Sequence, residues 1–403
     1  MFGFSNKIAA MAERSVILKR GKDKPVRNHH PWIFSGAIDR VDDTLKAGDV
    51  AQVFSAGNEF LGSGYFNPSS QITVRLLRFD DGAIDADFFD ERICRAVDLR
   101  HLWFPDPKMT NACRVIHSEG DFLPGLIVDR YADYLTVQFL TAGMDRWRDA
   151  ILNALVNRLS PRGIFEKGDA GERELEGLPL RNQMLHGEEV PKKLEILENG
   201  LRFLADLREG QKTGFFLDQR DNRKLIGSLC AGKKVLNCFS YTGAFSVYAA
   251  AGGAKQVISV DSSKPALEMA SEHFRLNKLE TPHEIVCADV FEYLRKCERE
   301  FDFIILDPPA FCKNKHQVGN ASRGYKDVNW QAIKRLSPGG LLYTASCSSF
   351  ISADLFQKIV FAAAKDAGRD VKILAKTSHP ADHPINVYHP EGEYLKGLLC
   401  QVS

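Results

Sequence analysis

The sequence predicts an α/β protein in three parts: a small N-terminal β-barrel, a small central α+β domain, and a C-terminal domain with a parallel-rich, doubly wound sheet. Three observations support this prediction. The chain has 403 residues, more than the ~100–200 of an ordinary domain. Short apolar runs separated by turn residues fill residues 13–82. Strand and helix patterns alternate through residues 196–403, which is typical of βαβ units.

Composition and charge are those of an ordinary globular chain. Hydrophobic residues make up 44% and charged residues 26%, which argues against long disordered regions. The net charge of +1 excludes a uniformly basic nucleic-acid binder but leaves room for a local basic patch. No apolar run approaches the ~18 residues of a membrane span, and the nine cysteines lack zinc-like spacing. We therefore expect a cytoplasmic protein with reduced thiols and no bound metal.

The N-terminal part combines an extension with a basic barrel. Residues 1–12 are predicted to be a flexible extension without the layout of a signal peptide, and Met11 is an alternative start to Met1. Residues 13–82 form the predicted barrel, which begins within a stretch, residues 1–40, that carries eight Lys and Arg against three acids. Five of these basic residues are candidates for contacts with RNA phosphates, or else form a solvated strand edge: Lys19, Arg20, Lys22, Lys24 and Arg27.

Aromatic residues of the barrel are candidates for stacking on bases. They are Trp32, Phe34, Tyr65 and Phe66. For Trp32 and Phe34 the favoured interpretation is a place in the barrel core, because large apolar side chains are usually buried.

Residues 83–195 are predicted to form a small, acidic α+β domain without catalytic residues. The patterns indicate a helix at 85–102, a hairpin with strands at 123–130 and 134–139, and a second helix at 145–159.

Residues 196–403 are predicted to hold the chemistry. Strands are expected at 235–237, 257–260, 284–287, 303–306 and 340–344, and helices at 244–251, 265–277 and 330–336. Asp261, Asp289 and Asp307 follow three of these strands, and a turn of small residues follows the first. Because the carboxyl ends of parallel strands share one crevice, we expect these carboxylates to face one ligand, although an acid after a strand also commonly caps the next helix.

The pattern favours a nucleoside ligand without a pyrophosphate. Asp261 lies 24 residues after Asn237, where a carboxylate can accept hydrogen bonds from both ribose hydroxyls. A nicotinamide dinucleotide is the main rival, and the GxGxxG turn that its pyrophosphate requires is missing.

The motifs together resemble a known family along the whole chain. Asn237-Cys-Phe-Ser-Tyr-Thr-Gly-Ala-Phe, Asp261, Asp289-Val and Asp307-Pro-Pro are similar to the Rossmann-like fold of S-adenosylmethionine-dependent methyltransferases. The segments 30–36, 64–68, 212–223, 344–348 and 394–397 resemble bacterial 23S ribosomal RNA (cytosine-5)-methyltransferases with an N-terminal PUA domain. The resemblance implies S-adenosylmethionine as cofactor, large-subunit ribosomal RNA as partner, and these cofactor-binding residues: Asp218, Asn237, Ser240, Tyr241, Gly243, Asp261, Asp289 and Asp307.

Carbon 5 of cytosine is a poor nucleophile, so its methylation needs a thiolate that first adds to carbon 6. Cys347 follows the strand 340–344 in a loop of small polar residues, at the same sheet edge as Asp307. We therefore expect Cys347 to be the nucleophile. The resemblance implies the same role for Cys347 and implies that Asp307 pairs with protonated N3. The structural alternative is that Cys347 is a small buried side chain.

Further roles remain open from the sequence. Cys312 is a candidate second thiol, with a plain filler role favoured. The base that removes the carbon-5 proton is His316, His379, His383 or a water held by Asp307. The polar segment 313–326 is a candidate flap over the substrate, or an ordinary surface loop.

Two alternative functions differ in class from this prediction. One keeps the cofactor and methylates a base nitrogen, in which case Cys347 is structural. The other is an RNA-binding module whose methyltransferase domain is inactive; the acids at positions 261, 289 and 307 argue against it. A monomer and a homodimer are both compatible with the sequence.

Overall fold

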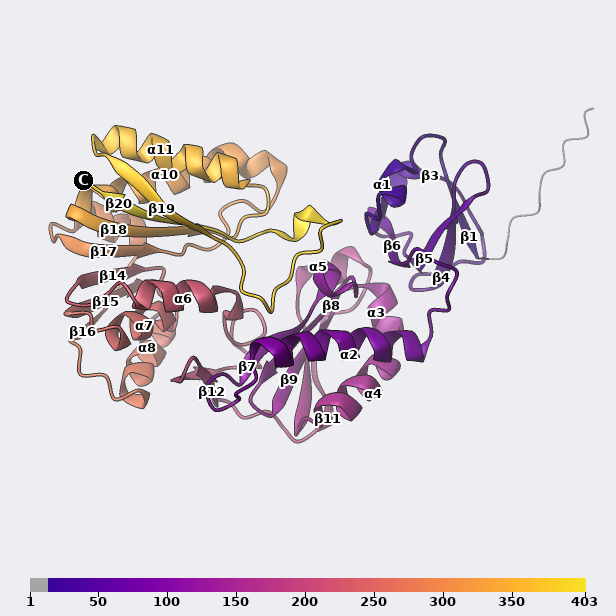
Figure 1. Cartoon of the computed structure of the whole chain (residues 1–403), viewed down its shortest axis with the longest axis horizontal. Coiled ribbons are helices and arrows are strands. Elements are labelled where there is room, and N and C mark those ends of the chain that lie inside the picture. The colour runs from indigo at the N-terminus through magenta and orange to yellow at the C-terminus, as the bar shows by residue number, and fades with distance from the viewer. Residues whose placement is uncertain (1–13) are drawn as a thin grey trace, which may run out of the picture. The chain divides into compact units, whose positions relative to one another are not determined.

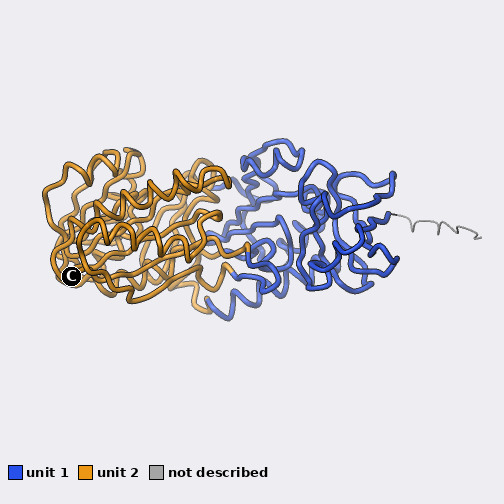
Figure 2. Tube along the Cα trace, turned by 90° about the horizontal axis from the view of Figure 1, so that it is seen from above, with its two compact units in different colours: residues 1–103, 114–190, 384–390 blue, residues 104–113, 191–383, 391–403 orange. Residues whose placement is uncertain are grey.

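The computed structural model describes residues 14–403, so the predicted extension 1–12 lies outside the described residues. The chain forms two compact units, coloured separately in Figure 2. Of the described residues, unit 1 contains 14–103, 114–190 and 384–390, and unit 2 contains 104–113, 191–383 and 391–403. The segment 384–390 therefore belongs to unit 1, although unit 2 precedes and follows it in the sequence.

The first part of unit 1 is a six-stranded sheet with the order β2-β6-β5-β4-β1-β3. The strands are β1 (Ser15–Leu18), β2 (Trp32–Phe34), β3 (Ile38–Val41), β4 (Val50–Phe54), β5 (Phe60–Phe66) and β6 (Ile72–Arg78), with the short helix α1 (Lys24–Arg27) between β1 and β2. Val16, Ile33, Val53 and Val74 meet in its core. Gly64 in β5 is required by close backbone approach, because a Cβ there would lie 2.1 Å from the Arg75 carbonyl oxygen.

The second part of unit 1 is a five-stranded sheet, order β11-β10-β9-β8-β7, with helices packed beside it (Figure 1). Its strands are β7 (Ala112–His117), β8 (Leu126–Tyr131), β9 (Tyr134–Phe139), β10 (Gly163–Gly168) and β11 (Arg181–Gly187). The helices are α2 (Ala86–Trp103), α3 (Ala142–Arg146), α4 (Arg148–Leu159) and α5 (Gly171–Leu175). The predicted single helix 145–159 is wrong in its first turn, because α3 ends at Arg146 and α4 begins at Arg148, with Trp147 as the cap residue between them.

Unit 2 is a seven-stranded sheet with the order β16-β15-β14-β17-β18-β20-β19. Its parallel strands are β14 (Lys234–Cys238), β15 (Gln256–Asp261), β16 (His283–Cys287), β17 (Phe301–Leu306) and β18 (Leu336–Ser346). β20 (Lys396–Val402) pairs antiparallel with β18 and with β19 (Val371–Thr377). A separate hairpin, β12 (Leu194–Glu198) and β13 (Leu201–Ala205), precedes the sheet. The predicted parallel-rich α/β fold is confirmed.

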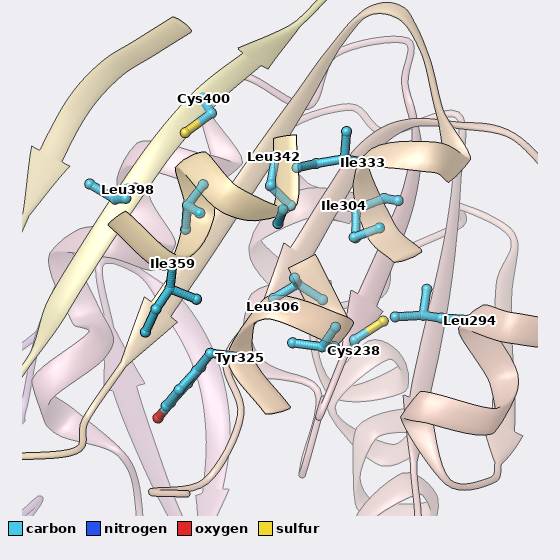
Figure 3. Packing of buried hydrophobic residues seen from close by; sticks show 14 of the residues in the cluster. Cys238, Leu294, Ile304, Leu306, Tyr325, Ile333, Leu342, Ile359, Leu398 and Cys400 are labelled. Atoms are coloured by element: carbon cyan, nitrogen blue, oxygen red, sulfur yellow. The ribbon is translucent and has the colours of Figure 1, made fainter. Parts of the chain in front are cut away.

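Helices cover both faces of this sheet, with α10 and α11 on one face and α6, α7 and α8 on the other (Figure 1). They are α6 (Arg220–Gly227), α7 (Ala244–Ala251), α8 (Lys264–Leu276), α9 (Val290–Lys296), α10 (Val318–Arg335) and α11 (Ala353–Ala367). Residues 303–306 of β17 are fully buried because the central strand of such a sheet has no solvent face. Figure 3 shows Ile304 and Leu306 packed with side chains of the neighbouring strands and helices.

The expectation for residues 313–326 is corrected by α10. The segment is not a flap: a single 3₁₀ turn at Lys315–Gln317 leads directly into the helix. Ala321 and Tyr325 are buried on its inner face, four residues apart. The polar residues around them hid this helical spacing in the sequence.

Two fully buried arginines of α6 fix its position in unit 2. Arg223 forms a bidentate pair with Glu198, with Nε donating to Oε1 at 2.8 Å and Nη2 to Oε2 at 2.7 Å. Arg220 donates to Asp382 Oδ2 at 2.8 Å and to the Ala112 carbonyl at 2.7 Å. Buried charges of this kind are tolerated only with complete partners.

We expect Glu198→Ala to lower the free energy of unfolding by about 3–5 kcal/mol, because it leaves the Arg223 guanidinium buried without its partner. Urea unfolding followed by circular dichroism measures this. The matched control is Glu195→Ala on the same strand, whose ion pair with Arg202 is solvent-exposed and contributes at most about 1 kcal/mol. Equal losses for the two variants would contradict the prediction.

Candidate functional site

A cavity of about 620 Å³ lies in unit 2 at the carboxyl ends of four strands. The carboxyl ends of β14, β15, β17 and β18 and the segments after them contribute residues 239–242, 244–245, 261–263, 307–310 and Cys347. Residues 211–219, ahead of α6, supply a further wall. This edge of a parallel sheet is where ligands bind in α/β proteins.

The turn after β14 is compact and strained. Phe239, Tyr241 and Gly243 have φ of 57°, 47° and 73°, in the left-handed region. Gly243 cannot be replaced easily, because a Cβ there would lie 2.6 Å from the Ala270 Cβ. The turn brings Ser240 and Tyr241 to the cavity surface.

The Asp261 carboxylate is held at the end of β15 by two backbone donors. Its Oδ2 accepts from Tyr241 N at 2.8 Å and its Oδ1 from Ser263 N at 2.9 Å. Each oxygen retains a second lone pair. An oriented carboxylate that lines the cavity can thus accept two hydroxyl donors from a ribose.

Asp218 is a buried anion with unmet hydrogen-bonding capacity. Its Oδ2 accepts from Lys212 Nζ at 2.5 Å and from Tyr394 Oη at 2.8 Å. Its Oδ1 has no hydrogen-bond partner within residues 14–403. Burial alone would raise the pKa of Asp218, but Lys212 and His383 outweigh burial and hold it below its usual range. This oxygen can take a cationic donor from a ligand.

Asp307 is a carboxyl group whose proton affinity is raised. It follows β17 and is partly buried, and its Oδ1 accepts from Gln219 Nε2 at 2.8 Å. Burial, and next the negative charge of Asp218, raise the pKa of Asp307 to about 7. At neutral pH this group can therefore exist as an acid or as a base.

Cys347 lines the same cavity and is partly buried. Its Sγ lies 4.0 Å from the Pro308 carbonyl oxygen, in the loop that carries Asp307. Burial, and next the Asp307 carboxylate, raise the pKa of the Cys347 thiol to about 11. The thiol is therefore protonated at neutral pH. Its reactivity depends on the charge of Asp307, because that charge alters how readily the thiolate forms.

Not every residue expected at the ligand reaches the cavity surface. Asn237 is fully buried in β14 and donates to Ser246 Oγ, and Gly243, which is part of the turn, does not line the cavity. Asp289 is exposed and caps α9 by accepting from Glu292 N, which is the capping alternative considered for such an acid. Asp218, Ser240, Tyr241, Asp261, Asp307 and Cys347 do line the cavity together.

The remaining thiol and imidazole candidates lie outside the cavity lining. Cys312 is a buried member of the hydrophobic core beneath the sheet edge. His316 is exposed, and His383 is buried beside Asp382 with its Nδ1 at 3.0 Å from Oδ1. His379 accepts from Leu395 N, and burial lowers its pKa to about 4. Lys212 and Gln219 line the cavity but were not predicted as site residues, although both lie in the segment 212–223.

In unit 1, the basic residues that are candidates for contacts with RNA phosphates differ in the partners they have within the chain. Arg20, Lys22 and Lys24 are exposed, Lys19 Nζ donates to the Gly36 carbonyl, and Arg27 is paired with Asp23 and Glu59.

The aromatic expectations need correction. Tyr65 and Phe66 are buried and cannot stack on bases. Phe34 is 49% exposed and Trp32 only partly buried, so the expected core placement of these two is wrong. Their strand β2 is an edge strand that buries only Ile33 between them.

Two features are absent from residues 14–403. They contain no cluster of three or more His, Cys, Asp or Glu placed to hold a metal ion. Over the same range, none of the helices is both long and apolar enough to span a membrane.

Models of two known families match different parts of the chain. The family model of S-adenosylmethionine-dependent methyltransferases matches residues 181–387, and that of PUA-like domains matches residues 16–79. A solved methyltransferase structure in complex with S-adenosylhomocysteine superposes with a TM-score of 0.83 at 28% identity, covering 96% of this chain and 99% of that one.

Curated relatives match along nearly the whole length. Ribosomal RNA large subunit methyltransferase I of Aliivibrio fischeri is 44% identical over 393 residues, covering 96% of this chain and 99% of the relative. The protein of the same name from Serratia proteamaculans is 42% identical, with coverage of 96% and 99%. The chain therefore belongs to the family of S-adenosylmethionine-dependent methyltransferases that includes the Ribosomal RNA large subunit methyltransferase I proteins.

Proposed function

We propose that this methyltransferase modifies carbon 5 of a cytosine in large-subunit ribosomal RNA, with Cys347 as nucleophile and Asp307 as the partner of N3. The observation that carries the proposal is the shared cavity: a thiol and a carboxyl group of raised pKa line one surface with the acids suited to a nucleoside. Large-subunit RNA as the substrate is supported by the names of relatives that are 42–44% identical over 96% of this chain.

The cavity residues fit the cofactor of the family. Asp261 offers acceptors for the two ribose hydroxyls. Asp218 Oδ1, buried and without a partner in the described residues, suits the ammonium group of the methionine part. Bound S-adenosylmethionine supplies an electrophilic methyl group, which carbon 5 accepts. Ser240 and Tyr241 border the same space.

The chain's own residues make carbon 5 nucleophilic. The Cys347 thiolate forms a bond to carbon 6, and the electrons of the 5,6 double bond become available at carbon 5 as N3 takes up a proton. Asp307 holds that proton between itself and N3. After methylation, a base removes the carbon-5 proton, the double bond re-forms, and the bond from Cys347 Sγ to carbon 6 breaks to release the thiolate.

The electrostatics of the pair fit this sequence of events. An Asp307 carboxylate raises the pKa of Cys347, so the thiolate is disfavoured in the resting cavity. When Asp307 shares a proton with N3, that negative charge is neutralised and the thiolate becomes easier to form. Pairing with cytosine and activation of the thiol are thus coupled.

Trapping tests the nucleophile directly. RNA that contains 5-fluorocytosine has no carbon-5 proton to lose, so we expect a covalent complex that survives a denaturing gel. We expect Cys347→Ala to abolish the band and to lower methylation of ordinary RNA about 1,000-fold or more. Cys312→Ala, which removes a buried thiol outside the cavity, is the matched control and retains both. Methylation without a band, and an active Cys347→Ser, would move the acceptor to a base nitrogen.

The coupled pair predicts the pH dependence of kcat/KM for RNA. The reactive form has a proton on Asp307 and a thiolate at Cys347. It holds as many protons as the form that dominates between the two pKa values, in which Asp307 is ionised and Cys347 is protonated. We therefore expect kcat/KM to rise with pH up to about 7 and to stay level between about 7 and about 11. In Asp307→Asn only the thiol titrates, so we expect the rise to continue past pH 7 toward the pKa of Cys347, with kcat/KM at pH 7 at least about 100-fold lower than in the wild type. An unchanged acid limb in that variant would rule out Asp307 as its source.

Isothermal titration with S-adenosylhomocysteine tests the cofactor site. We expect Asp261→Asn to weaken binding about 10- to 100-fold, because two hydrogen bonds to a charged acceptor are weakened. Glu268→Gln, on the exposed face of α8, is the control for the loss of one negative charge and binds like the wild type. Equal affinity in all three proteins would contradict the placement of the ribose at Asp261.

A further inference from the structure

A second cavity, of about 370 Å³, lies entirely within unit 1. The six-stranded sheet and its turns contribute His29 and residues 76–80, and the second part of the unit contributes Arg92, Glu119 and Phe122. The segment 384–390 completes the wall with Asn386 and Tyr388. The volume is within the range of small-molecule sites.

Aromatic rings form one wall of this cavity. The His29 ring is stacked on Phe79, with centroids 4.4 Å apart and an interplanar angle of 8°. The Tyr388 ring lies 5.2 Å from His29 and is 46% exposed, and Phe122 is 42% exposed. Exposed flat rings around a cavity are the stacking platforms that single-stranded nucleic acids use, because every base has a π-face.

A cation without a counter-ion lies beside these rings. Within residues 14–403, Arg92 forms no ion pair, and its guanidinium carbon lies 5.2 Å from the Phe122 centroid and 5.4 Å from that of Phe88. Burial, and next the neighbouring Arg95, lower the pKa of Arg92. By contrast, the other arginine of the lining, Arg78, is neutralised by Asp80 at 2.6 Å. Arg92 therefore offers an unmatched positive charge to an anion.

Polar groups on the wall are held in defined orientations. Glu119 Oε1 accepts from Trp32 Nε1 at 2.8 Å, and the buried Asn386 accepts through Oδ1 from Tyr388 N at 2.9 Å. A fixed carboxylate and a fixed amide provide acceptors and donors for the edge of a base.

The backbone is strained at two of the ring-bearing positions. His29 and Phe122 have φ of 61° and 59°, a region that residues other than glycine rarely adopt. Strained conformations of this kind concentrate at ligand sites, where the surrounding structure holds them. Both strained residues line this one cavity.

We propose that this cavity binds one unstacked nucleotide of the RNA substrate, with its base against His29, Phe122 and Tyr388 and its phosphate at Arg92. The inference rests on the proposed RNA substrate but not on the carbon-5 chemistry. It assigns unit 1 a nucleotide-binding subsite whose lining includes none of the basic residues 19–27.

Fluorescence anisotropy with a labelled single-stranded RNA hexamer and the full-length protein, without methyl donor, tests this subsite. We expect Tyr388→Ala and Arg92→Gln each to raise the Kd at least about fivefold, and Tyr388→Phe to bind like the wild type. Arg95→Gln is the matched control: it removes an equal charge from the same helix, but Arg95 is paired with Glu91 and lies outside the cavity. A loss in Arg92→Gln no larger than in Arg95→Gln, together with an unchanged Kd for Tyr388→Ala, would overturn the proposal.

Photo-crosslinking gives a readout on the wild-type protein. RNA that contains 4-thiouridine is expected to crosslink to peptides with Phe122 or Tyr388; crosslinks that all map elsewhere overturn the proposal. The outcomes separate the two hypotheses, since neither assay needs methyl transfer. Variant-sensitive binding without methylation would support the subsite and refute the carbon-5 chemistry. Methylation together with a Kd that none of the variants changes would refute the subsite and leave the carbon-5 proposal standing. A wild type that binds no RNA would refute both.

Discussion

The buried carboxylate of Glu198 is the constraint on which the catalytic cavity depends. It forms the bidentate pair with Arg223 and lies 3.6 Å from Arg220, so one negative charge at the end of β12 positions two guanidinium groups of α6. α6 follows Gln219 directly, and residues 211–219 form a wall of the cavity. The position of Lys212, Asp218 and Gln219 therefore follows from an ion pair whose arginine, Arg223, also lines the cavity. The desolvation of these charges is offset by the ion pairs and hydrogen bonds that the two guanidinium groups form with Glu198, Asp382 and the Ala112 carbonyl.

Around the cavity, burial and the charge of the neighbouring group determine the pKa values of Asp218, Asp307 and Cys347. Lys212 and His383 keep Asp218 ionised. Burial, and next that fixed negative charge, raise the pKa of Asp307 to about 7, and burial, and next the Asp307 charge, raise the pKa of Cys347. Each group is thus set by the one before it. Because the charges act in sequence, a change at Lys212 would be transmitted through two carboxylates to the thiol.

Much of this arrangement could be predicted from sequence because parallel βαβ topology converts order along the chain into a place at one sheet edge. Asp261, Asp307 and Cys347 each follow a clearly apolar strand, and all three line the cavity. The prediction was less successful where local pattern and tertiary packing diverge. The helix predicted at 330–336 covers only the end of α10. The first turns were missed because, up to residue 326, only Ala321 and Tyr325 are buried, among polar neighbours. Asp289 caps a helix, and no local pattern distinguishes a cap from a ligand. The cavity of unit 1 combines residues separated by more than three hundred positions, so no local motif announces it.

The interleaving of the two units along the chain has a consequence for biosynthesis. Unit 1 takes its last segment from residues 384–390, and unit 2 takes its first from residues 104–113. A nascent chain folds in order of emergence, and domains made of one continuous stretch can complete early. Neither unit of this protein can complete early, because Tyr388, in the last segment of unit 1, is synthesised only 14 residues before Val402, the end of the last strand of unit 2. Both units thus reach their final structure only after residues beyond 384 have been synthesised, so a chain truncated before residue 384 lacks part of each unit.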